Sequence, residues 1–564
     1  MKVLGVHFET HDCGAALVRD GEIVSVINEE RLSHKKHDKR APVLAIRACL
    51  DEAGLAPSDL DIVAFSGLPL PRAYFGYLNW EVRRAFWRHG ATFPFRRSPY
   101  KLLGFRRLRR SIKKLAKIHE ALSGFSGTYR HYAHEHLHVT GAYWTSGMDD
   151  PVIVVAEGAG WDRTSCVTVR EGNGWREIAH TPWPHSPGLF YDCVTALAGF
   201  GQFHAGKITG LAACGDPSKC RDLVRPLLAH KDMRFVAHPD IFRWVLNPPA
   251  EVMAHNREDL SAAFQERLEE VVVDLVATAV ERTGRDQVAL AGGTFANVKL
   301  NQRIRALDSV REIFVHPGMS DIGQALGAAL EAYAETDAQF QPSRLDHVYF
   351  GPRYDTAAVQ AALREADLPF EHHKDGIEKV VAQKIHEGAV VGRFAGGMEY
   401  GPRSLGNRSI VYAPTDPAVN DWLNERLERS EFMPFAPAAT WENRHRLFQG
   451  LDGAEYTAQF MTITCDCTDE TKRVAPAIVH VDGTARPHLV RRETNPSFHR
   501  LLSEYEAISG IPCLINTSFN MHEDPIVCTP KDGITGFLRS RLDFLAIEDC
   551  LVPLPEELRV PRPG

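Results

Sequence analysis

The stretch KVLGVHFETHDCGAALVRDGEIVSVINEE (residues 2–30) decides the fold class. It is typical of three strands separated by two turns, because two apolar runs flank the polar turn ETHDCG and Asp20-Gly21 is a strong hairpin signal. The same pattern returns at 152–175 as VIVVAEGAGWDRTSCVTVREGNGW, where an apolar strand enters a glycine-rich turn and a second strand leaves it. Two such hairpins predict a duplicated α/β domain.

In duplicated domains of the actin and sugar-kinase type, each half contributes a hairpin turn whose backbone N–H groups face phosphates between the lobes. A third turn, in QVALAGGTFANVKLNQRI (287–304), places Gly292 and Gly293 between a strand and a predicted helix. Glycine permits a close backbone approach to a ligand, so both residues and Asn297 are candidates for nucleotide binding. The alternative is an ordinary strand-to-helix loop.

HYAHEHLHVT (131–140) precedes the second hairpin and contains a possible metal-ligand pair. His134 and His138 are four residues apart, so on a helix their imidazoles share one face. A chain with 26 histidines also produces such pairs by chance. Asp321, in IFVHPGMSDIGQALGAALEAY (313–333), is either a helix cap or a ligand that reaches back to these histidines.

Length and composition restrict the remaining choices. The 564 residues suggest about two to four domains, and the net charge of −7 gives no case for a nucleic-acid partner. The N-terminus lacks the pattern of a signal peptide, and no apolar run approaches the roughly 18 residues of a membrane span. We therefore expect a cytoplasmic protein without membrane contact, whose 11 scattered cysteines are reduced. The basic segment 105–117 is expected to be a solvated helix face.

A polar linker, ETDAQFQPSRLDH (335–347), separates this region from a second α/β region. There GRFAGGMEYGPRSLGNRSIV (392–411), PAIVHVDGTARPHLV (476–490) and GIPCLINTSFNMHEDPIVCTP (510–530) each place polar residues after an apolar strand. Arg403, Arg408 and Arg486 suit bidentate binding of phosphate or carboxylate, and Asn516 lies in the third of these segments.

Taken together, these motifs resemble the O-carbamoyltransferases of nodulation-factor and antibiotic biosynthesis. The resemblance also includes INEERLSHKKH, GLFYDCVTALAGFGQFHAGKITGLAACG (188–215), SDIGQALGAAL and NTSFN, in the same order along nearly the whole chain. It implies an N-terminal actin-like metal domain (1–345) and a C-terminal YrdC-like domain (346–564). The implied reaction moves a carbamoyl group from carbamoyl phosphate, through a carbamoyl-adenylate made with ATP and Mg²⁺, to a hydroxyl of a small-molecule acceptor such as a secondary metabolite.

The resemblance also implies roles for single residues. His134, His138 and Asp321 match the family's metal ligands, and Glu157 stands where the family has an aspartate, one methylene shorter. Two imidazoles with two carboxylates suit Fe²⁺, the metal of the family, or Mn²⁺ or Zn²⁺. His11 is the candidate base, with Asp12 beside it, and Lys207 is expected to meet phosphate.

Three departures from the family pattern lie in RLERSEFMPFAP (426–437). Leu427 and Met433 replace two cations, and Ser430 replaces a glutamate. Arg426 and Arg429 are near enough in sequence to substitute for the lost charges. Two alternatives therefore stay open: a related acyl- or amide-forming transferase with another donor, and a nucleotide-binding assembly subunit without turnover. The sequence leaves the acceptor and the oligomeric state undecided.

Overall fold

The computed structural model describes residues 1–67, 100–160, 163–428 and 435–559, and its fold is mixed α/β, as predicted. The chain forms two compact units. The first comprises Met1–Glu29 and Lys39–Leu345, and the second comprises Glu30–Asp38 and Asp346–Gly564. The segment 30–38 belongs to the second unit, where Arg31 Nη2 donates to the Gly401 carbonyl at 3.1 Å.

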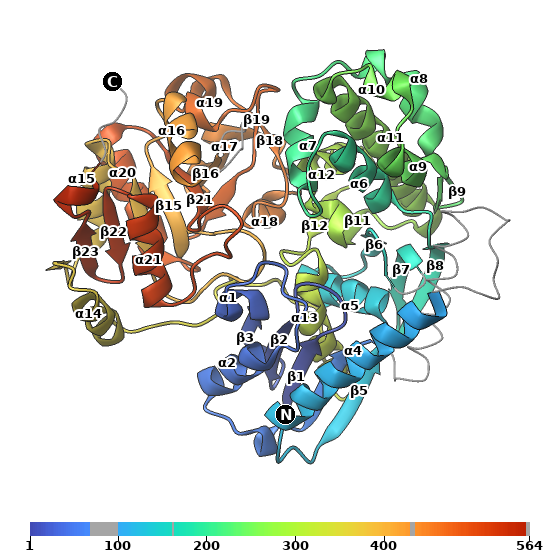
Figure 1. The fold of residues 1–564 in the computed structure, drawn as a ribbon, viewed down its shortest axis with the longest axis horizontal. Coiled ribbons are helices and arrows are strands. Elements are labelled where there is room, and N and C mark those ends of the chain that lie inside the picture. Colours follow the sequence, from blue (N-terminus) through green and yellow to red (C-terminus); the bar gives the residue numbers. More distant parts are fainter. Residues whose placement is uncertain (68–99, 161–162, 429–434, 560–564) are drawn as a thin grey trace. The chain divides into compact units, whose positions relative to one another are not determined.

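The first sheet of the N-terminal unit has the order β3-β2-β1-β4-β5 (Figure 1). The predicted hairpins form β1 (Lys2–His7), β2 (Gly14–Arg19) and β3 (Glu22–Asn28), which are antiparallel neighbours. Asp20 and Gly21 both have positive φ, 52° and 86°, as a two-residue hairpin turn requires. The parallel strands β4 (Ile62–Ser66) and β5 (Thr128–Tyr132) complete the sheet.

The second sheet repeats this topology, which confirms the predicted duplication. β6 (Val152–Ala156), β7 (Arg163–Glu171) and β8 (Gly174–Pro182) are antiparallel neighbours. β11 (Gln287–Ala291) and β12 (Glu312–Val315) then add in parallel, in the order β12-β11-β6-β7-β8. In each half the first strand is almost fully buried and lies at the centre of the sheet, so a buried strand holds the polar turn that follows it.

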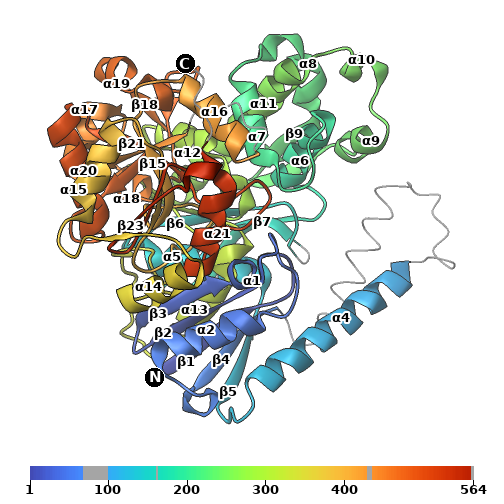
Figure 2. The same cartoon turned by 60° about the vertical axis from the view of Figure 1, so that its left-hand side comes forward.

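The two halves exchange their last helices. α5 (His134–Ser146) follows the first sheet but packs on β6, β11 and β12 of the second. α13 (Gln324–Ala334) follows the second sheet but packs on β1, β2 and β4 of the first. The two helices also pack against each other, so each sheet is covered by a helix from the opposite half (Figure 2).

Glycines allow this close packing. A Cβ on Gly5 of β1 would lie 1.9 Å from the Ala325 carbonyl oxygen. One on Gly327 would lie 2.3 Å from the Leu137 carbonyl oxygen. Backbone therefore meets backbone along α13, and no side chain fits between.

Further helices extend the two halves. α6 (Pro187–Leu197), α7 (Ala205–Ala212) and α11 (Arg257–Thr283) pack against one another in the segment between β8 and β11 (Figure 2). The predicted basic helix is α4 (Tyr100–Ala121), which contacts α2 (Val43–Ala53). The described cations at 109, 110, 113 and 117 are exposed, as expected for a solvated face, whereas Lys114 is partly buried and donates to the Phe8 carbonyl.

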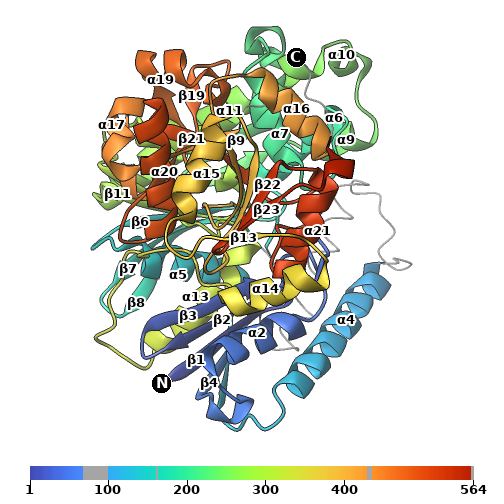
Figure 3. The same ribbon diagram turned by 90° about the vertical axis from the view of Figure 1, so that its left-hand side faces the viewer.

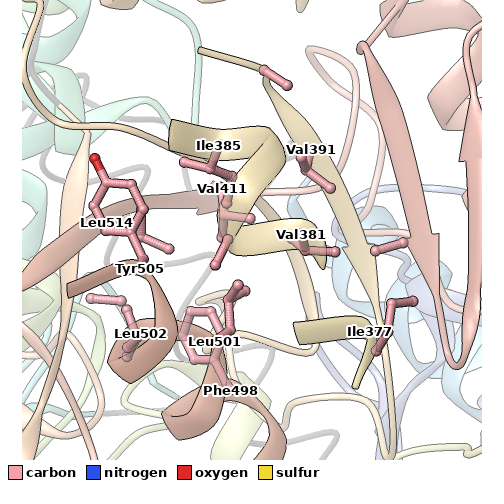
Figure 4. Close-up of a cluster of buried hydrophobic side chains, with 14 of the residues drawn as sticks. Ile377, Val381, Ile385, Val391, Val411, Phe498, Leu501, Leu502, Tyr505 and Leu514 are labelled. Atoms are coloured by element: carbon pink, nitrogen blue, oxygen red, sulfur yellow. The ribbon is translucent and has the colours of Figure 1, made fainter. Parts of the chain in front are cut away.

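The C-terminal unit is built on an eight-stranded mixed sheet in the order β13-β23-β22-β14-β15-β21-β16-β20. Figure 3 labels four of its strands, β13, β21, β22 and β23. The strands are β13 (Glu371–His372), β14 (Val391–Phe394), β15 (Arg408–Tyr412), β16 (Ala436–Thr440), β20 (His488–Val490), β21 (Cys513–Ser518), β22 (Phe544–Ile547) and β23 (Cys550–Pro553). A hydrophobic cluster joins α15 (Ile377–His386) and α20 (Pro496–Ser509) to this sheet (Figure 4). Val381 and Ile385 on α15 belong to it with Phe498 and Leu502 on α20, next to Val411 of β15.

The departures near residue 430 lie partly outside the described residues, which include neither Arg429, Ser430 nor Met433. Leu427 is described: it caps α16 (Ala418–Arg426) at its C-terminal end and is 0% exposed. It is therefore a core residue in this chain. Arg426 stacks on Trp422, 3.9 Å from the ring centroid, and bonds to the Arg541 carbonyl. Among the described helices, none combines the length and apolar character needed to cross a bilayer.

Candidate metal centre and anion site

Four buried side chains of the N-terminal unit converge at the start of the two exchanged helices. They are His134, His138, Glu157 and Asp321, whose candidate ligand atoms all lie within 4.8 Å of one another. His134 Nε2 is 3.0 Å from Glu157 Oε2 and 3.3 Å from Asp321 Oδ1. His138 Nε2 is 3.4 Å and 3.6 Å from the same two oxygens. The structure thus brings together all four residues predicted as metal ligands.

Local structure explains why these residues meet. His134 is the first residue of α5, and His138 follows one turn later on the same face, with ring centroids 5.0 Å apart. Glu157 comes directly after the buried strand β6. Asp321 begins the short 3₁₀ turn Asp321–Gly323 that leads into α13. The helix exchange therefore places ligands from both halves at one point.

The chemistry of this cluster suits a divalent cation. His134 Nδ1, His138 Nε2 and Glu157 Oε1 are buried without a hydrogen-bond partner. Such groups are costly to bury unless a further partner satisfies them. Two imidazoles and two carboxylates are a common donor set for first-row divalent metals.

The charges of the four clustered side chains shift one another's pKa values. Burial alone lowers the pKa of His134, but the nearby carboxylates of Glu157 and Asp321 outweigh it and raise this pKa well above its usual value. The same balance raises the pKa of His138. In turn, the histidines outweigh the effect of burial on Glu157 and hold its pKa at about 2. Without metal, the cluster therefore holds protons on its imidazoles and charge on its carboxylates.

His11 lies beside this cluster on the turn between β1 and β2. Its Nδ1 is 2.7 Å from Asp12 Oδ2, and its Nε2 is 3.6 Å from Asp321 Oδ2. Burial lowers the pKa of His11, but the charges of Asp321 and Asp12 raise it to about 9. The two predicted catalytic residues are thus a hydrogen-bonded pair at the edge of the candidate metal centre.

A second layer of polar residues supports Asp321 and His134. The Thr10 hydroxyl donates to Asp321 Oδ2 and lies 3.0 Å from His7 Nε2. His7 Nδ1 is 2.6 Å from the Ser66 hydroxyl, and burial lowers the pKa of His7 to about 3. Gln324 Nε2 donates to the His134 carbonyl at 3.0 Å. Sequence reasoning missed these residues; only Thr10, inside the turn ETHDCG, carried a visible signal.

The glycine turn after β11 has a structural role as well as a possible ligand role. Gly292 has φ +97°, and a Cβ there would lie 2.3 Å from the carbonyl oxygen of Ala156, which precedes Glu157. Its N–H donates to the Met319 carbonyl at 2.5 Å. Gly292 therefore braces the turns that carry Glu157 and Asp321, whereas Gly293 faces open space.

Two other predicted binding residues of this unit are buried. Asn297 caps α12 (Val298–Arg305) by accepting from the Leu300 N–H at 3.1 Å, and its Nδ2 donates to Gln265 at 2.8 Å. These bonds give Asn297 a structural role. Lys207 lies on α7 with its ammonium 5.4 Å from the centroid of the Phe200 ring.

In the C-terminal unit, two predicted phosphate ligands form an uncompensated pair of cations. Arg403 and Arg486 each bury Nε without a partner, and within the described residues neither has a hydrogen bond or an ion pair. Burial lowers the pKa of Arg403 to about 10. Burial and the charge of Arg403 together hold the pKa of Arg486 well below its usual value. Two guanidinium groups that repel each other in a desolvated setting favour an anionic ligand.

Polar atoms beside this pair are also unsatisfied. Ser404 Oγ and Asn516 Oδ1 are buried without a partner, while Asn516 Nδ2 donates to the Ser404 carbonyl at 3.2 Å. Arg408 differs from its two neighbours. It is 0% exposed, and its terminal nitrogens donate to the carbonyls of Ala395 and Gly396 at 2.9 and 3.1 Å, among others. This geometry favours a structural role for Arg408.

Comparison with known proteins gives matches along most of the chain. Residues 2–330 match the family Carbamoyltransferase N-terminus, and residues 382–553 match Carbamoyltransferase C-terminus. The uncharacterized protein sll1178 of Synechocystis sp. is 30% identical over 98% of this chain and 96% of its own. Nodulation protein NolNO of Sinorhizobium fredii is 31% identical over 96% of this chain and 79% of its own. Full-length HypF, solved in a phosphate- and nucleotide-bound form, is 11% identical with a TM-score of 0.34, over 60% of this chain and 47% of its own.

We predict that His138→Ala loses a tightly bound divalent metal, because the substitution removes one of two nitrogen donors. His136→Ala is the matched control: it lies on the same helix, but its Nε2 pairs with Glu331 Oε1 at 3.1 Å. Metal analysis after extensive dialysis should find about one ion per chain in the wild type and in His136→Ala, and little in His138→Ala. Equal metal content in His138→Ala and the wild type would contradict the assignment of His138 as a metal ligand.

Metal binding to the metal-free protein should release protons at neutral pH. The pKa of His134 is raised well above 6.5 in the metal-free cluster, so at pH 7 an incoming cation must displace a proton from this ligand. Affinity should therefore fall as pH falls, by up to about tenfold per pH unit for each proton released. Calorimetry in buffers of different ionisation enthalpy measures the proton count. An affinity that stays constant between about pH 6 and 8 would contradict this.

Proposed function

This chain belongs to the carbamoyltransferase family, and we propose that it carries a carbamoyl group from carbamoyl phosphate, through a carbamoyl-adenylate made with ATP, to a hydroxyl of a small-molecule acceptor. The observation that carries this proposal is the position of His11, which is paired with Asp12 and lies next to the four candidate metal ligands. A family of carbamoyltransferases needs a proton acceptor at the acceptor hydroxyl, and His11 is placed to serve as one.

The transfer step assigns a role to each atom of this pair. The acceptor oxygen attacks the carbamoyl carbon, the bond from that carbon to the AMP oxygen breaks, and the hydroxyl proton passes to His11 Nε2. Asp12 accepts a hydrogen bond from His11 Nδ1 at 2.7 Å, which fixes the tautomer and stabilises the imidazolium that forms. The products are the carbamoylated acceptor and AMP.

His134, His138, Glu157 and Asp321 would hold a divalent cation, with Fe²⁺ as the first candidate. When bound, such a cation would offset the carboxylate charges beside His11 and stabilise negative charge on nearby oxygens. His11, whose pKa is about 9 in the metal-free cluster, is a poor base until these charges are offset. The cluster and His11 therefore act as one site.

The adenylate is proposed to form in the C-terminal unit. Carbamoyl phosphate and one water give carbamate and phosphate, and carbamate with Mg²⁺-bound ATP gives carbamoyl-adenylate and pyrophosphate. Every reactant except water is an anion, and Arg403 with Arg486 offers two cations that no described residue pairs with.

These arginines also bear on the residues that depart from the family pattern. Leu427 is fully buried, so its position cannot present a charge to a ligand in this chain. Arg403 and Arg486 supply positive charge without it. The proposed donor therefore remains carbamoyl phosphate, rather than a different acyl donor.

We predict that His11→Asn slows transfer from preformed carbamoyl-adenylate by about two to four powers of ten, the usual effect of losing a general base. Adenylate formation from ATP and carbamoyl phosphate should stay near the wild-type rate, because that step uses the other unit. His445→Asn, an exposed histidine of the C-terminal unit, is the control and should change neither rate. If His11→Asn kept normal transfer but lost adenylate formation, His11 would serve adenylate formation, and its assignment to the transfer step would be wrong.

The complementary prediction concerns Arg486→Ala. It should weaken adenylate formation by roughly ten- to a hundredfold at low carbamoyl phosphate, since each charge-assisted bond to an anion is worth about 1.5–3 kcal/mol. Transfer from preformed adenylate should be unchanged. Thermal stability should be maintained or rise, because the variant removes a repulsion with Arg403.

Arg500→Ala provides the matched control. This arginine is 62% exposed, and its one ion pair within the described residues, with Glu378, is long at 3.9 Å. It should leave all three measurements unchanged. A large loss of stability in Arg486→Ala with normal kinetics for adenylate formation would show that Arg486 is structural.

A further inference from the structure

One strongly charged surface of the N-terminal unit has no part in the mechanism above. It lies on α4, where Arg109, Arg110, Lys113 and Lys117 are all exposed. Within the described residues, none of the four has a hydrogen bond or an ion pair. At 100° per residue these positions fall within about 100° of the helix circumference. They therefore form one continuous stripe, which we call the basic face.

The opposite side of α4 fixes the direction of the basic face. There Ile118 is fully buried, and α4 packs against α2. The Lys114 ammonium donates to the Phe8 carbonyl, and His119 Nδ1 lies 3.1 Å from the Tyr129 hydroxyl. These contacts turn the basic face away from the protein, and Figures 2 and 3 show α4 at the outside of the N-terminal unit.

Helix α11 of the same unit places its cations differently. Arg257, Arg267 and Arg282 each pair with a carboxylate, at 3.0, 2.7 and 2.8 Å. On the basic face, like charges instead follow one another at intervals of four residues, an arrangement that destabilises a helix. An anionic partner would offset this repulsion.

The sequence around the basic face is also strongly positive. Residues 82–119 contain 13 lysines and arginines and no aspartate or glutamate. Removing these 13 positive charges from the net charge of −7 would leave −20, so the basic face lies within a positive stretch of an otherwise acidic chain. Positive charge spread over so many residues favours an extended anionic surface over a single small anion.

Apolar and aromatic residues indicate which kind of anionic surface fits. Ile112 borders the basic face and is 46% exposed. In the sequence, residues 74–95 include eight aromatic residues, among them Trp80 and Trp87. Apolar residues among lysine and arginine, with Trp and Tyr nearby in the sequence, are typical of segments that contact the headgroup region of a membrane. Binding to a nucleic-acid backbone would use the charges alone.

We propose that the basic face of α4 binds the surface of a membrane that contains anionic lipids. Its four cations meet lipid phosphates, and Ile112 contacts the headgroup region. The contact is peripheral, because the apolar side of α4 is packed against protein. We expected no membrane contact because the sequence lacks a membrane span, but a peripheral contact needs none. The inference does not depend on the proposed carbamoyl transfer.

The test measures co-sedimentation of the 564-residue chain with large vesicles, without metal or nucleotide. One set of vesicles is phosphatidylcholine alone, and the other contains about one-third phosphatidylglycerol. The face variant combines Arg109→Gln, Arg110→Gln, Lys113→Gln and Lys117→Gln.

The matched control removes the same number of charges from the C-terminal unit. It replaces four exposed cations that have no ion pair within the described residues, and it combines Lys374→Gln, Lys379→Gln, Arg473→Gln and Arg492→Gln. The two variants thus have equal net charge and differ only in where the charge is lost. Thermal unfolding should show that both are folded, since every replaced side chain is exposed.

The wild type should bind the anionic vesicles and leave phosphatidylcholine vesicles unbound. Each cation near an anionic surface strengthens binding by about fivefold, so the face variant should bind about two to three powers of ten more weakly. The control should stay within about threefold of the wild type. Raising NaCl from about 0.05 to 0.5 M should release the wild type. Ile112→Ser should weaken binding by about three- to tenfold at either salt concentration, because salt does not screen an apolar contact.

Three results would overturn the inference. The first is a wild type that binds both kinds of vesicle equally or binds neither. The second is an equal loss of binding in the face variant and the control, which would reduce the effect to net charge. The third comes from a short single-stranded RNA and a short DNA duplex at the same phosphate concentration. If the wild type bound either more tightly than the anionic vesicles, and the face variant did not, the basic face would be a nucleic-acid surface.

Discussion

The N-terminal site depends on the backbone contact between the exchanged helices and the sheets that they cover. α13 approaches β1 so closely that the Ala325 carbonyl occupies the place of a side chain at Gly5, and α5 approaches α13 equally closely at Gly327. Because His134 begins one of these helices and Asp321 leads into the other, this packing sets the distance between ligands that are far apart in sequence. A change of a few tenths of an ångström in the packing would change the donor geometry directly.

Charge is distributed differently in the two units, and this distribution matches the chemistry proposed for each. The N-terminal site gathers carboxylates around His11 and two further histidines, a donor set that suits a divalent cation. In the C-terminal unit, no described residue supplies a counter-charge to Arg403 and Arg486, which favours an anionic ligand. A cation bound at the first site and an anion bound at the second, as proposed above, would each stabilise the folded unit that binds it.

The sequence predicted those features that rest on local patterns. The Asp20-Gly21 turn and the repeated hairpin followed from residue types at fixed spacing, and the spacing of His134 and His138 correctly placed both on one helix face. The convergence of Asp321 and Glu157 on them depended on the helix exchange, which no local pattern encodes; here the family resemblance supplied what periodicity could not. Arg403 and Arg408 looked equivalent in sequence. Only the fold shows that backbone carbonyl groups accept hydrogen bonds from Arg408 and not from Arg403. His7 read as an ordinary strand residue because its partner Ser66 lies on a different strand.

The exchange of helices also has a consequence for synthesis of the chain on the ribosome. The strands β1, β2 and β4 are complete once residue 66 has been synthesised, but α13, the helix that covers them, ends at residue 334. α5 emerges early, yet the strands β11 and β12 that it packs on follow more than 100 residues later. The sheet face that α13 covers, and the part of α5 that packs on β11 and β12, cannot be buried until nearly the whole unit has left the exit tunnel, so the nascent chain exposes apolar surface for much of its translation. Such a chain has a long window in which chaperones, rather than its own tertiary contacts, must shield it from aggregation.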